Sequence, residues 1–320
     1  MAALLRSTLL AAARSPRLER TVTRMPLSRS VVARFVAGTT TEQAVRACET
    51  LLRTRRFVSV DYLGEDTTDL AGAVATVEQY RTLITALGRL PQAAVAAGAV
   101  RPLEVSVKLS ALGQTLPNTG HAIALDHARQ ICAAAEAAGV WVTLDAEGHT
   151  TTDSTLAIVR ELRVDYPWLG TVLQAYLRRT EQDCREFAGP GSRVRLCKGA
   201  YDEPESVAYR DRAEVDASYL RCLGILTAGA GYPMIASHNP TVLAAAGVGV
   251  RSARRKTDEY EYQMLYGIRA DEQQRIADAD NHLRVYVPYG EQWYGYFVRR
   301  LAERPANLAF FLRALVSGRG

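Results

Sequence analysis

The feature that most constrains the fold of this chain is a regular alternation of short apolar segments with helical stretches. Eight segments rich in β-branched and aromatic residues start 22–46 residues apart, and a helical stretch follows each. Strands at such intervals are typical of βα units. The predicted strands are FVSVDY (57–62), LEVSVKL (103–109), VWVTLDA (140–146), TVLQAY (171–176), RVRLCKG (193–199), YPMIASH (232–238), EYEYQML (259–265) and LRVYVPY (283–289).

Two α/β folds contain repeated βα units of this kind. A doubly wound sheet usually has about six strands and carries a glycine-rich phosphate loop after one of them. No G-x-G-x-x-G pattern follows any of the eight segments. The sequence therefore predicts a (βα)8 barrel of the TIM type over residues 57–320, preceded by a helical extension over residues 1–56. In such barrels the functional groups stand at the C-terminal ends of the strands.

Basic residues are concentrated at the start of the chain. Residues 1–60 hold eleven Arg and no Lys against three Glu, a balance of +8. Of the 39 basic and 34 acidic residues in the chain, the other 260 positions keep 28 and 31, a balance of −3. A nucleic-acid-binding protein should carry a basic face on its folded domain, so no nucleic-acid partner is predicted.

The basic extension has two interpretations. Its Arg and Ser content is typical of a mitochondrial transit peptide, whereas a basic amphipathic part of the folded protein resting on anionic lipid fits the use of Arg along the whole chain. We favour the second, and expect a helix over residues 41–56 that Thr41 caps. The expected location is cytoplasmic; peripheral contact with the inner membrane and a mitochondrial location stay open as alternatives.

The cysteines and histidines argue against a disulfide framework and a metal site. The chain has five Cys, an odd number, and no C-x-x-C pattern, which fits a reducing compartment. Its five His show no ligand spacing, so no metal site is predicted. No apolar run approaches the ~18–20 residues that span a bilayer.

Polar side chains stand at the end of nearly every predicted strand. Because the C-terminal ends of the strands meet at one rim of a barrel, these side chains should surround a single pocket. A full ring of them indicates an active site above an apolar barrel. The ring consists of Asp61, Lys108, Asp145 with Glu147, Gln174 with Tyr176, Arg195 with Lys198, His238 with Asn239, Gln263 and Tyr286.

Lysine is rare in this chain, and its positions are informative. Among 39 basic residues only three are Lys, and two of these, Lys108 and Lys198, lie at strand ends. This placement suggests that a compact ammonium is wanted there rather than a planar guanidinium. Lys108 and Asp145 come from neighbouring strands, so we expect an ion pair between them. Arg195, inside the apolar run VRLC, needs an anionic partner or an electron-rich cofactor; an internal salt bridge without a catalytic role is the alternative.

The last helical stretch, after residue 289, contains the pair Arg299 and Arg300 between apolar residues. Adjacent helical positions point about 100° apart, so both side chains reach a pocket only near a helix end or edge. Two guanidiniums at a barrel mouth would bind a carboxylate through charge-assisted hydrogen bonds. Ordinary surface arginines are the alternative.

In this order, the segments resemble the proline dehydrogenase family over residues 57–310. RLCKGAY and YFVRRL are the most specific of the matching stretches. The others are VSVKLSALG, VTLDAEG, VLQAY, ASHNP, EYQMLYGI and YVPYGEQWYGY. The resemblance implies a monofunctional FAD-dependent enzyme that oxidises L-proline to Δ1-pyrroline-5-carboxylate, the first step of proline catabolism. It also implies hydride transfer from proline C5 to FAD N5 and a quinone as the electron acceptor, reached through peripheral membrane contact. The oligomeric state stays open.

Residue roles follow from the same resemblance, position by position. Cys197, where the family often has Val, and Ser237, where Thr is common, are departures that keep the size of the side chain. The implied catalytic residues are Asp145 and Arg195. Substrate contact is implied for Lys108, Tyr201, Tyr286, Arg299 and Arg300, and flavin contact for Ala146, Gln174, Lys198, Gly199, Ala200, Ser237 and His238.

Two other functions remain as alternatives. Another flavin-dependent barrel, similar to methylenetetrahydrofolate reductase, shares the fold and the cofactor but gives no reason for the Arg299–Arg300 pair. A non-enzymatic barrel that binds a small amino acid would have no need of a complete polar rim. Reduction of a bound flavin by proline separates both alternatives from the family assignment.

Overall fold

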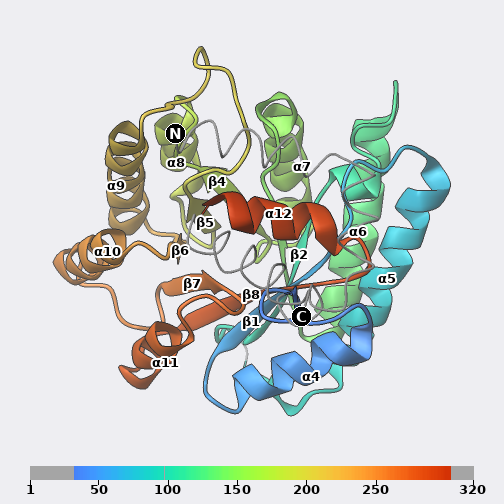
Figure 1. Ribbon diagram of the computed structural model, residues 1–320, viewed down its shortest axis with the longest axis horizontal. Coiled ribbons are helices and arrows are strands. Elements are labelled where there is room, and N and C mark those ends of the chain that lie inside the picture. The colour runs from blue at the N-terminus through green and yellow to red at the C-terminus, as the bar shows by residue number, and fades with distance from the viewer. Residues whose placement is uncertain (1–31, 97, 304–320) are drawn as a thin grey trace, which may run out of the picture.

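Eight parallel strands close into a barrel, in which each strand pairs with the next and the last pairs with the first (Figure 1). The structure, a computed structural model, describes residues 32–96 and 98–303, and its side chains up to residue 298. All eight predicted strands are confirmed in their predicted order. They are β1 (Phe57–Tyr62), β2 (Leu103–Val107), β3 (Trp141–Leu144), β4 (Gly170–Gln174), β5 (Arg193–Cys197), β6 (Tyr232–Ala236), β7 (Glu261–Leu265) and β8 (Leu283–Tyr289).

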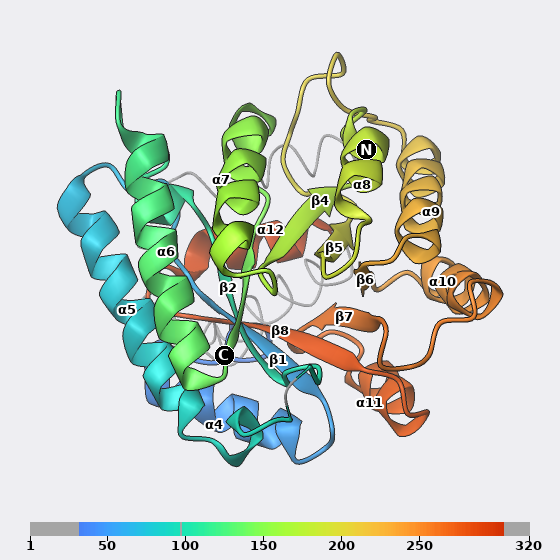
Figure 2. The same ribbon diagram turned by 180° about the vertical axis from the view of Figure 1, so that it is seen from behind.

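One helix follows each strand, as the βα pattern predicts. The helices are α5 (Leu70–Gly88), α6 (Gly120–Ala138), α7 (Thr152–Asp165), α8 (Thr180–Phe187), α9 (Arg212–Ala228), α10 (Pro240–Ser252), α11 (Ala270–Asp278) and α12 (Trp293–Glu303). The short 3-10 turns are η1 (Pro91–Ala93), η2 (Ser110–Leu112) and η3 (His149–Thr151). Figures 1 and 2 show α5 to α11 around the strands.

Helix α12 does not join this outer layer. Helix α12 lies across the end of the barrel at which the strands finish, and Figure 2 shows it on the far side of the strands. Its residues Tyr296 and Phe297 pack with Leu63, which follows β1, and with Ile268, which follows β7. Helix α12 therefore covers the mouth of the barrel through apolar contacts.

A helix from before the barrel takes the vacated place in the wall. Helix α4 (Thr41–Leu52) packs against β1, β8 and α5. Its buried residues Ala44, Cys48 and Leu51 belong to the same hydrophobic core as the outward faces of the strands. The outer layer is complete because α4 stands where the eighth helix of a regular barrel would stand.

The predicted start and end of this helix need correction. The N-cap is Thr40, whose hydroxyl accepts a hydrogen bond from the backbone N–H of Gln43 at 3.4 Å, and the Gln43 side chain accepts from the Thr40 N–H at 3.3 Å. This capping box places Thr41 inside the helix instead. The helix ends at Leu52 rather than at residue 56, because Arg55 adopts a positive φ of 59°.

Candidate functional site

Alternate residues of the strands point into the barrel, and many of them are polar. On β1 the apolar residues Val58 and Val60 face the helices and are fully buried, whereas Ser59 and Asp61 face the interior. The same alternation places polar side chains inside from β2, β3, β5, β7 and β8. The polar interior residues that make hydrogen bonds or ion pairs with one another are Ser59, Asp61, Glu104, Ser106, Lys108, Asp145, Arg193, Arg195, Glu261, Gln263, Arg284 and Tyr286.

Arg195 joins the two sides of the barrel. Its Nη1 donates to Asp145 Oδ1 at 2.7 Å and its Nη2 to Glu104 Oε1 at 2.9 Å. Its Nε donates to Gln263 Oε1 at 2.5 Å, while the hydroxyls of Ser59 and Ser106 accept at 3.1 and 2.8 Å. The guanidinium thereby connects β1, β2 and β7 with the residue that follows β3. The anionic partner predicted for Arg195 is present, and it consists of two carboxylates.

Lys108 has a closer partner than the one predicted. Its Nζ lies 2.7 Å from both oxygens of Asp61, whereas Asp145 Oδ2 is 3.7 Å away. The predicted pair with Asp145 exists as the longer of the two contacts. Tyr286 completes the group, because its hydroxyl donates to Asp145 Oδ2 at 2.8 Å and lies 3.3 Å from the ammonium.

The interior charges balance, and they shift the pKa values of their neighbours. Burial raises the pKa of Asp61 to about 6, although Lys108 acts in the opposite direction. Burial acts to lower the pKa of Lys108, but the two nearby carboxylates outweigh it and raise that pKa. Four cations face four carboxylates, so the network has no net charge. They are Lys108, Arg193, Arg195 and Arg284 against Asp61, Glu104, Asp145 and Glu261.

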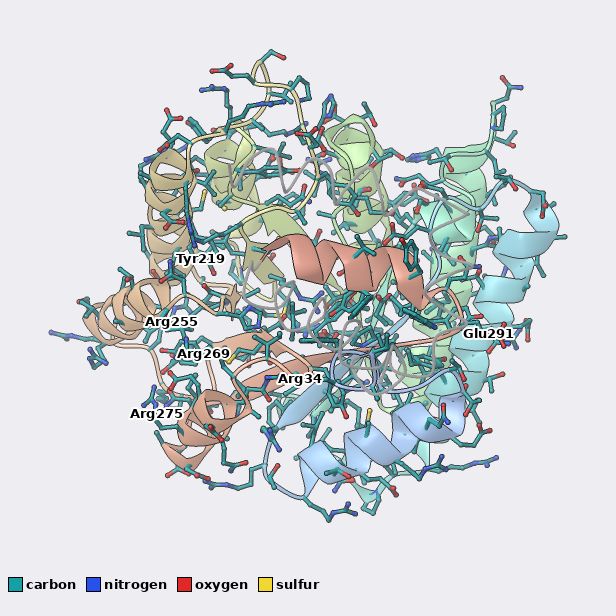
Figure 3. All side chains as sticks on the ribbon, in the orientation of Figure 1. Arg34, Tyr219, Arg255, Arg269, Arg275 and Glu291 are labelled. Carbon is teal, nitrogen blue, oxygen red and sulfur yellow. The ribbon has the colours of Figure 1, made fainter. Side chains whose placement is uncertain are left out.

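The other predicted residues lie on the loops that surround this network. Lys198 follows β5 and forms an ion pair with Asp216 of α9. The Ser237 hydroxyl accepts from the backbone N–H of Asn239 at 3.1 Å. His238 Nε2 accepts from the N–H of Leu265 at 2.9 Å, and Arg269, labelled in Figure 3, donates to its carbonyl oxygen. Ala146, Gly199, Ala200 and Tyr201 are half-buried on the same rim.

Two observations indicate that this rim is built for a bound group. Gln174 is buried, and its Oε1 has no hydrogen-bond partner within the described residues. A buried amide oxygen without a partner costs free energy unless a ligand or water supplies a donor. Gly199 has a φ of +108°, and its backbone approaches the ring of Tyr176 so closely that a Cβ would lie 2.2 Å from Cδ1. Only glycine allows this course of the chain, which leads into the loop after β5.

The predicted arginine clamp can be placed only by its backbone. Arg299 and Arg300 belong to α12, the helix that lies across the barrel mouth. Their side chains lie outside the described residues, so their contact with a ligand stays a prediction.

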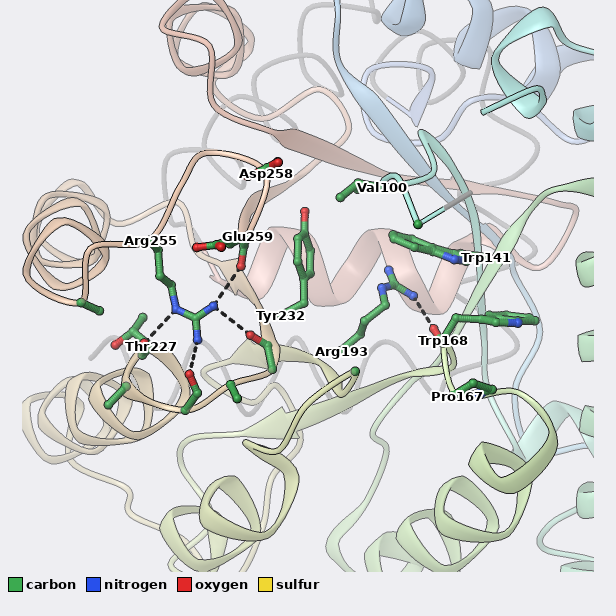
Figure 4. Close-up of a pocket in the computed structure, with 17 residues that line it drawn as sticks. Val100, Trp141, Pro167, Trp168, Arg193, Thr227, Tyr232, Arg255, Asp258 and Glu259 are labelled. Atoms are coloured by element: carbon green, nitrogen blue, oxygen red, sulfur yellow. Dashed lines mark hydrogen bonds between the residues drawn. The ribbon is translucent and has the colours of Figure 1, made fainter. Parts of the chain in front are cut away.

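A hollow lies at the opposite end of the barrel (Figure 4). Its volume is about 870 Å³, and the first residues of three strands, Trp141, Arg193 and Tyr232, line it. The donors of Arg255 at its edge are taken up by backbone carbonyls, including those of Gly229 at 2.6 Å and Thr227 at 2.8 Å. This hollow is far from the polar rim and shares none of the predicted site residues.

Comparison with known proteins identifies the family. The sequence pattern of the family described as "Proline dehydrogenase" matches residues 44–313. The chain belongs to the proline dehydrogenase family. It is 35% identical over 283 residues to proline dehydrogenase 1 of Bacillus subtilis strain 168, covering 88% of this chain and 90% of that protein. It is 37% identical over 291 residues to proline dehydrogenase of Deinococcus radiodurans, covering 90% of this chain and 91% of that protein.

Solved structures agree with the fold. Proline utilization A (PutA) of Bdellovibrio bacteriovorus, inactivated by N-propargylglycine, superposes with a TM-score of 0.76 at 29% identity. The superposition covers 86% of this chain but only 32% of that one, so the chain spans about a third of the PutA protein. A PutA variant of Bradyrhizobium japonicum, 24% identical with a TM-score of 0.71, supports the barrel fold alone. Within the described residues, no helix combines the length and hydropathy needed to cross a membrane.

Several residues of the site had no predicted role. The sequence predicts Asp61 on the rim without a partner, and it gives no role to Glu104, which lies one layer deeper. The signal was present, because polar residues at every second position of an apolar segment indicate a face that points into the barrel. The pattern predicts Glu147 on the rim but not its partner Ser110, and it gives no role to Glu203, whose partner His149 comes from a distant loop.

Proposed function

We propose that this protein oxidises L-proline to Δ1-pyrroline-5-carboxylate, the first step of proline catabolism, with FAD as its cofactor. The observation that carries the proposal is the group of Lys108, Asp145, Arg195 and Tyr286 at the barrel mouth. All four are side chains that the resemblance implies for catalysis or substrate contact, and the hydrogen bonds described above join them in one network.

The rim residues fit a flavin. Gln174 offers a buried amide oxygen to a ring N–H, and Lys198 offers positive charge to an anionic ring. Ala146, Gly199, Ala200, Ser237 and His238 would complete the binding site. When bound, FAD would supply the chemistry, accepting at N5 the hydride that leaves proline C5.

The protein's own groups would bind and orient the substrate. Arg299 and Arg300 would hold the proline carboxylate and so fix the direction of C5, a positioning effect. Tyr286, half-buried at the mouth, would pack on the proline ring and exclude water. Arg195 would hold Asp145 in place beneath the pocket through its 2.7 Å hydrogen bond.

Proton loss from the proline amine must precede imine formation. The proposed reaction should therefore accelerate between about pH 6 and pH 9, as the proline amine deprotonates. A turnover rate that stays constant over this range would contradict the assignment.

The electron acceptor and the location of the protein belong to the same proposal. We propose a quinone as acceptor, reached by peripheral contact of the basic N-terminal residues with an anionic membrane surface, in a cytoplasmic protein. Addition of quinone-loaded anionic vesicles should speed flavin reoxidation, and neutral vesicles should do so much less.

Anaerobic titration of the purified protein with L-proline tests the central proposal. Proline should bleach the flavin absorbance, and NADH should not. The double variant Arg299→Ala with Arg300→Ala should retain flavin but require far more proline. A protein that purifies without flavin, or a flavin that proline leaves oxidised, would refute the proposal.

A further inference from the structure

The loop that carries Tyr201 is fastened by a buried carboxylate that no part of the proposed reaction uses. Glu203 lies two residues beyond Tyr201 and is 7% exposed. Its Oε1 accepts from the backbone N–H of His149 at 2.8 Å and from the hydroxyl of Tyr176 at 3.3 Å. Its Oε2 pairs with Nδ1 of the same histidine. One side chain thereby connects the loops after β3, β4 and β5.

Tyr176 transmits this contact to the rest of the loop. Its N–H donates to the carbonyl of Lys198 at 2.9 Å, and its own carbonyl accepts from Tyr209 at 2.7 Å. Its phenol oxygen takes a further hydrogen bond from the backbone of Tyr201. Its ring fills the space beneath Gly199. The loop is thus held at its start, at its middle and at its end by a single tyrosine.

The burial of Glu203 needs an explanation. A carboxylate removed from water is unfavourable unless it is paired and hydrogen-bonded. A loop that only connects a strand to a helix would be more stable with a neutral side chain at this position. Glu205, two residues further, shows the usual alternative, because it is exposed. The buried position therefore points to a requirement for a fixed loop geometry.

We propose that Glu203, held by His149, is a positioning residue that fixes Tyr201 against the substrate. This inference rests on the proposed function and on the contact with proline that the family resemblance implies for Tyr201. Glu203 itself touches neither substrate nor flavin. Loss of the Glu203 carboxylate should weaken the binding of proline more than it slows turnover, because Tyr201 would contact the proline ring both before and during the reaction.

Steady-state kinetics of Glu203→Ala provide the first test. The KM for proline should rise about tenfold while kcat changes less than about threefold. Glu203→Gln should restore most of the KM, because its amide oxygen can still accept from His149 N–H and Tyr176. Glu205→Ala, on the same loop, is the matched control and should behave as the unaltered protein does.

Hydrogen exchange of the peptide spanning 199–209 supplies a readout besides activity. Exchange of its amides should accelerate in Glu203→Ala and not in Glu205→Ala. An unchanged KM and unchanged exchange in Glu203→Ala, or a loss of kcat without a change in KM, would overturn the inference. Should Glu203→Ala not fold, His149→Ala decides by the same two measurements, because the 32% exposed histidine side chain can be removed with little loss of packing.

The two proposals fail in different ways. If proline does not reduce the flavin of the unaltered protein, the proposed function is wrong. If it does, and Glu203→Ala matches Glu205→Ala, only the role of Glu203 is wrong.

Discussion

Replacing Glu104 with Gln should destabilise the protein strongly although it removes no atom from the core. Glu104 is fully buried on β2, where it accepts hydrogen bonds from Ser59 at 2.7 Å and Arg195 at 2.9 Å and pairs with Arg193. The isosteric amide would leave four interior cations facing three carboxylates. Breaking a buried ion pair from one side costs about 3–5 kcal/mol. For 320 residues this loss corresponds to a melting temperature lower by roughly 4–7 °C.

Chemical denaturation of the flavin-loaded protein measures this loss. Glu78→Gln is the control, because its pair with Arg81 at 3.0 Å is exposed and should be worth less than about 1 kcal/mol. Adding Arg193→Met to Glu104→Gln restores the balance of charge and should recover a large part of the loss. A free energy of unfolding for Glu104→Gln within about 1 kcal/mol of the unaltered protein would refute the account of the barrel interior.

Three further changes test other parts of the site. Burial raises the pKa of Glu147 from 4.5 to about 7, so its negative charge destabilises the folded protein as pH rises through that interval. In urea unfolding, Glu147→Gln should therefore have a free energy of unfolding about 3 kcal/mol above that of the unaltered protein at pH 8, and nearly the same value at pH 4.5. An equal difference at both pH values would contradict the pKa shift. Tyr286→Phe removes the 2.8 Å hydrogen bond to Asp145 and should slow proline turnover about tenfold. Its free energy of unfolding should change by less than about 1.5 kcal/mol. Unaltered turnover would show that the hydroxyl has no role in the reaction. Gly199→Ala, at φ +108°, should lower flavin occupancy, read as the ratio of flavin to protein absorbance, whereas Gly224→Ala, in an open helical position, should leave it unchanged.

The strands could be predicted because each of them has an apolar face that packs against the helices and a face that points into the barrel. Outward residues such as Val58, Val60 and Val105 must be apolar to pack on helices. The sequence therefore contains eight short segments with apolar residues at these positions, one for each strand. Many inward residues, such as Ser59, Asp61 and Glu104, are polar, and this alternation indicates where the candidate site lies. The sequence therefore contains the barrel and the ring of functional groups.

The choice between two equally placed partners could not be predicted. Lys108 directly follows β2, which lies between β1 and β3, and each neighbouring strand offers a carboxylate at its end. The structure places its ammonium 2.7 Å from Asp61 and 3.7 Å from Asp145. Which carboxylate lies nearer depends on the conformation of a long flexible side chain, which the spacing of residues in the sequence does not determine.

Contacts between loops were also beyond prediction. His149 and Glu203 are 54 positions apart, and neither lies in a periodic segment. The place of α12 was predictable only in part: the arginine pair suggested a helix at the mouth, whereas the packing of Tyr296 and Phe297 on the loops after β1 and β7 required the fold itself.

The position of α4 has a practical consequence for dissecting this protein. A shortened version that starts at Phe57 would look complete by its repeat pattern, since it would contain every βα unit. It would nevertheless leave a furrow in the wall between α5 and α11, lined by the apolar surface that Ala44, Cys48 and Leu51 now cover. Such a fragment should aggregate, so a vector designed for expression or fusion ought to retain at least the turn that begins at Gly38.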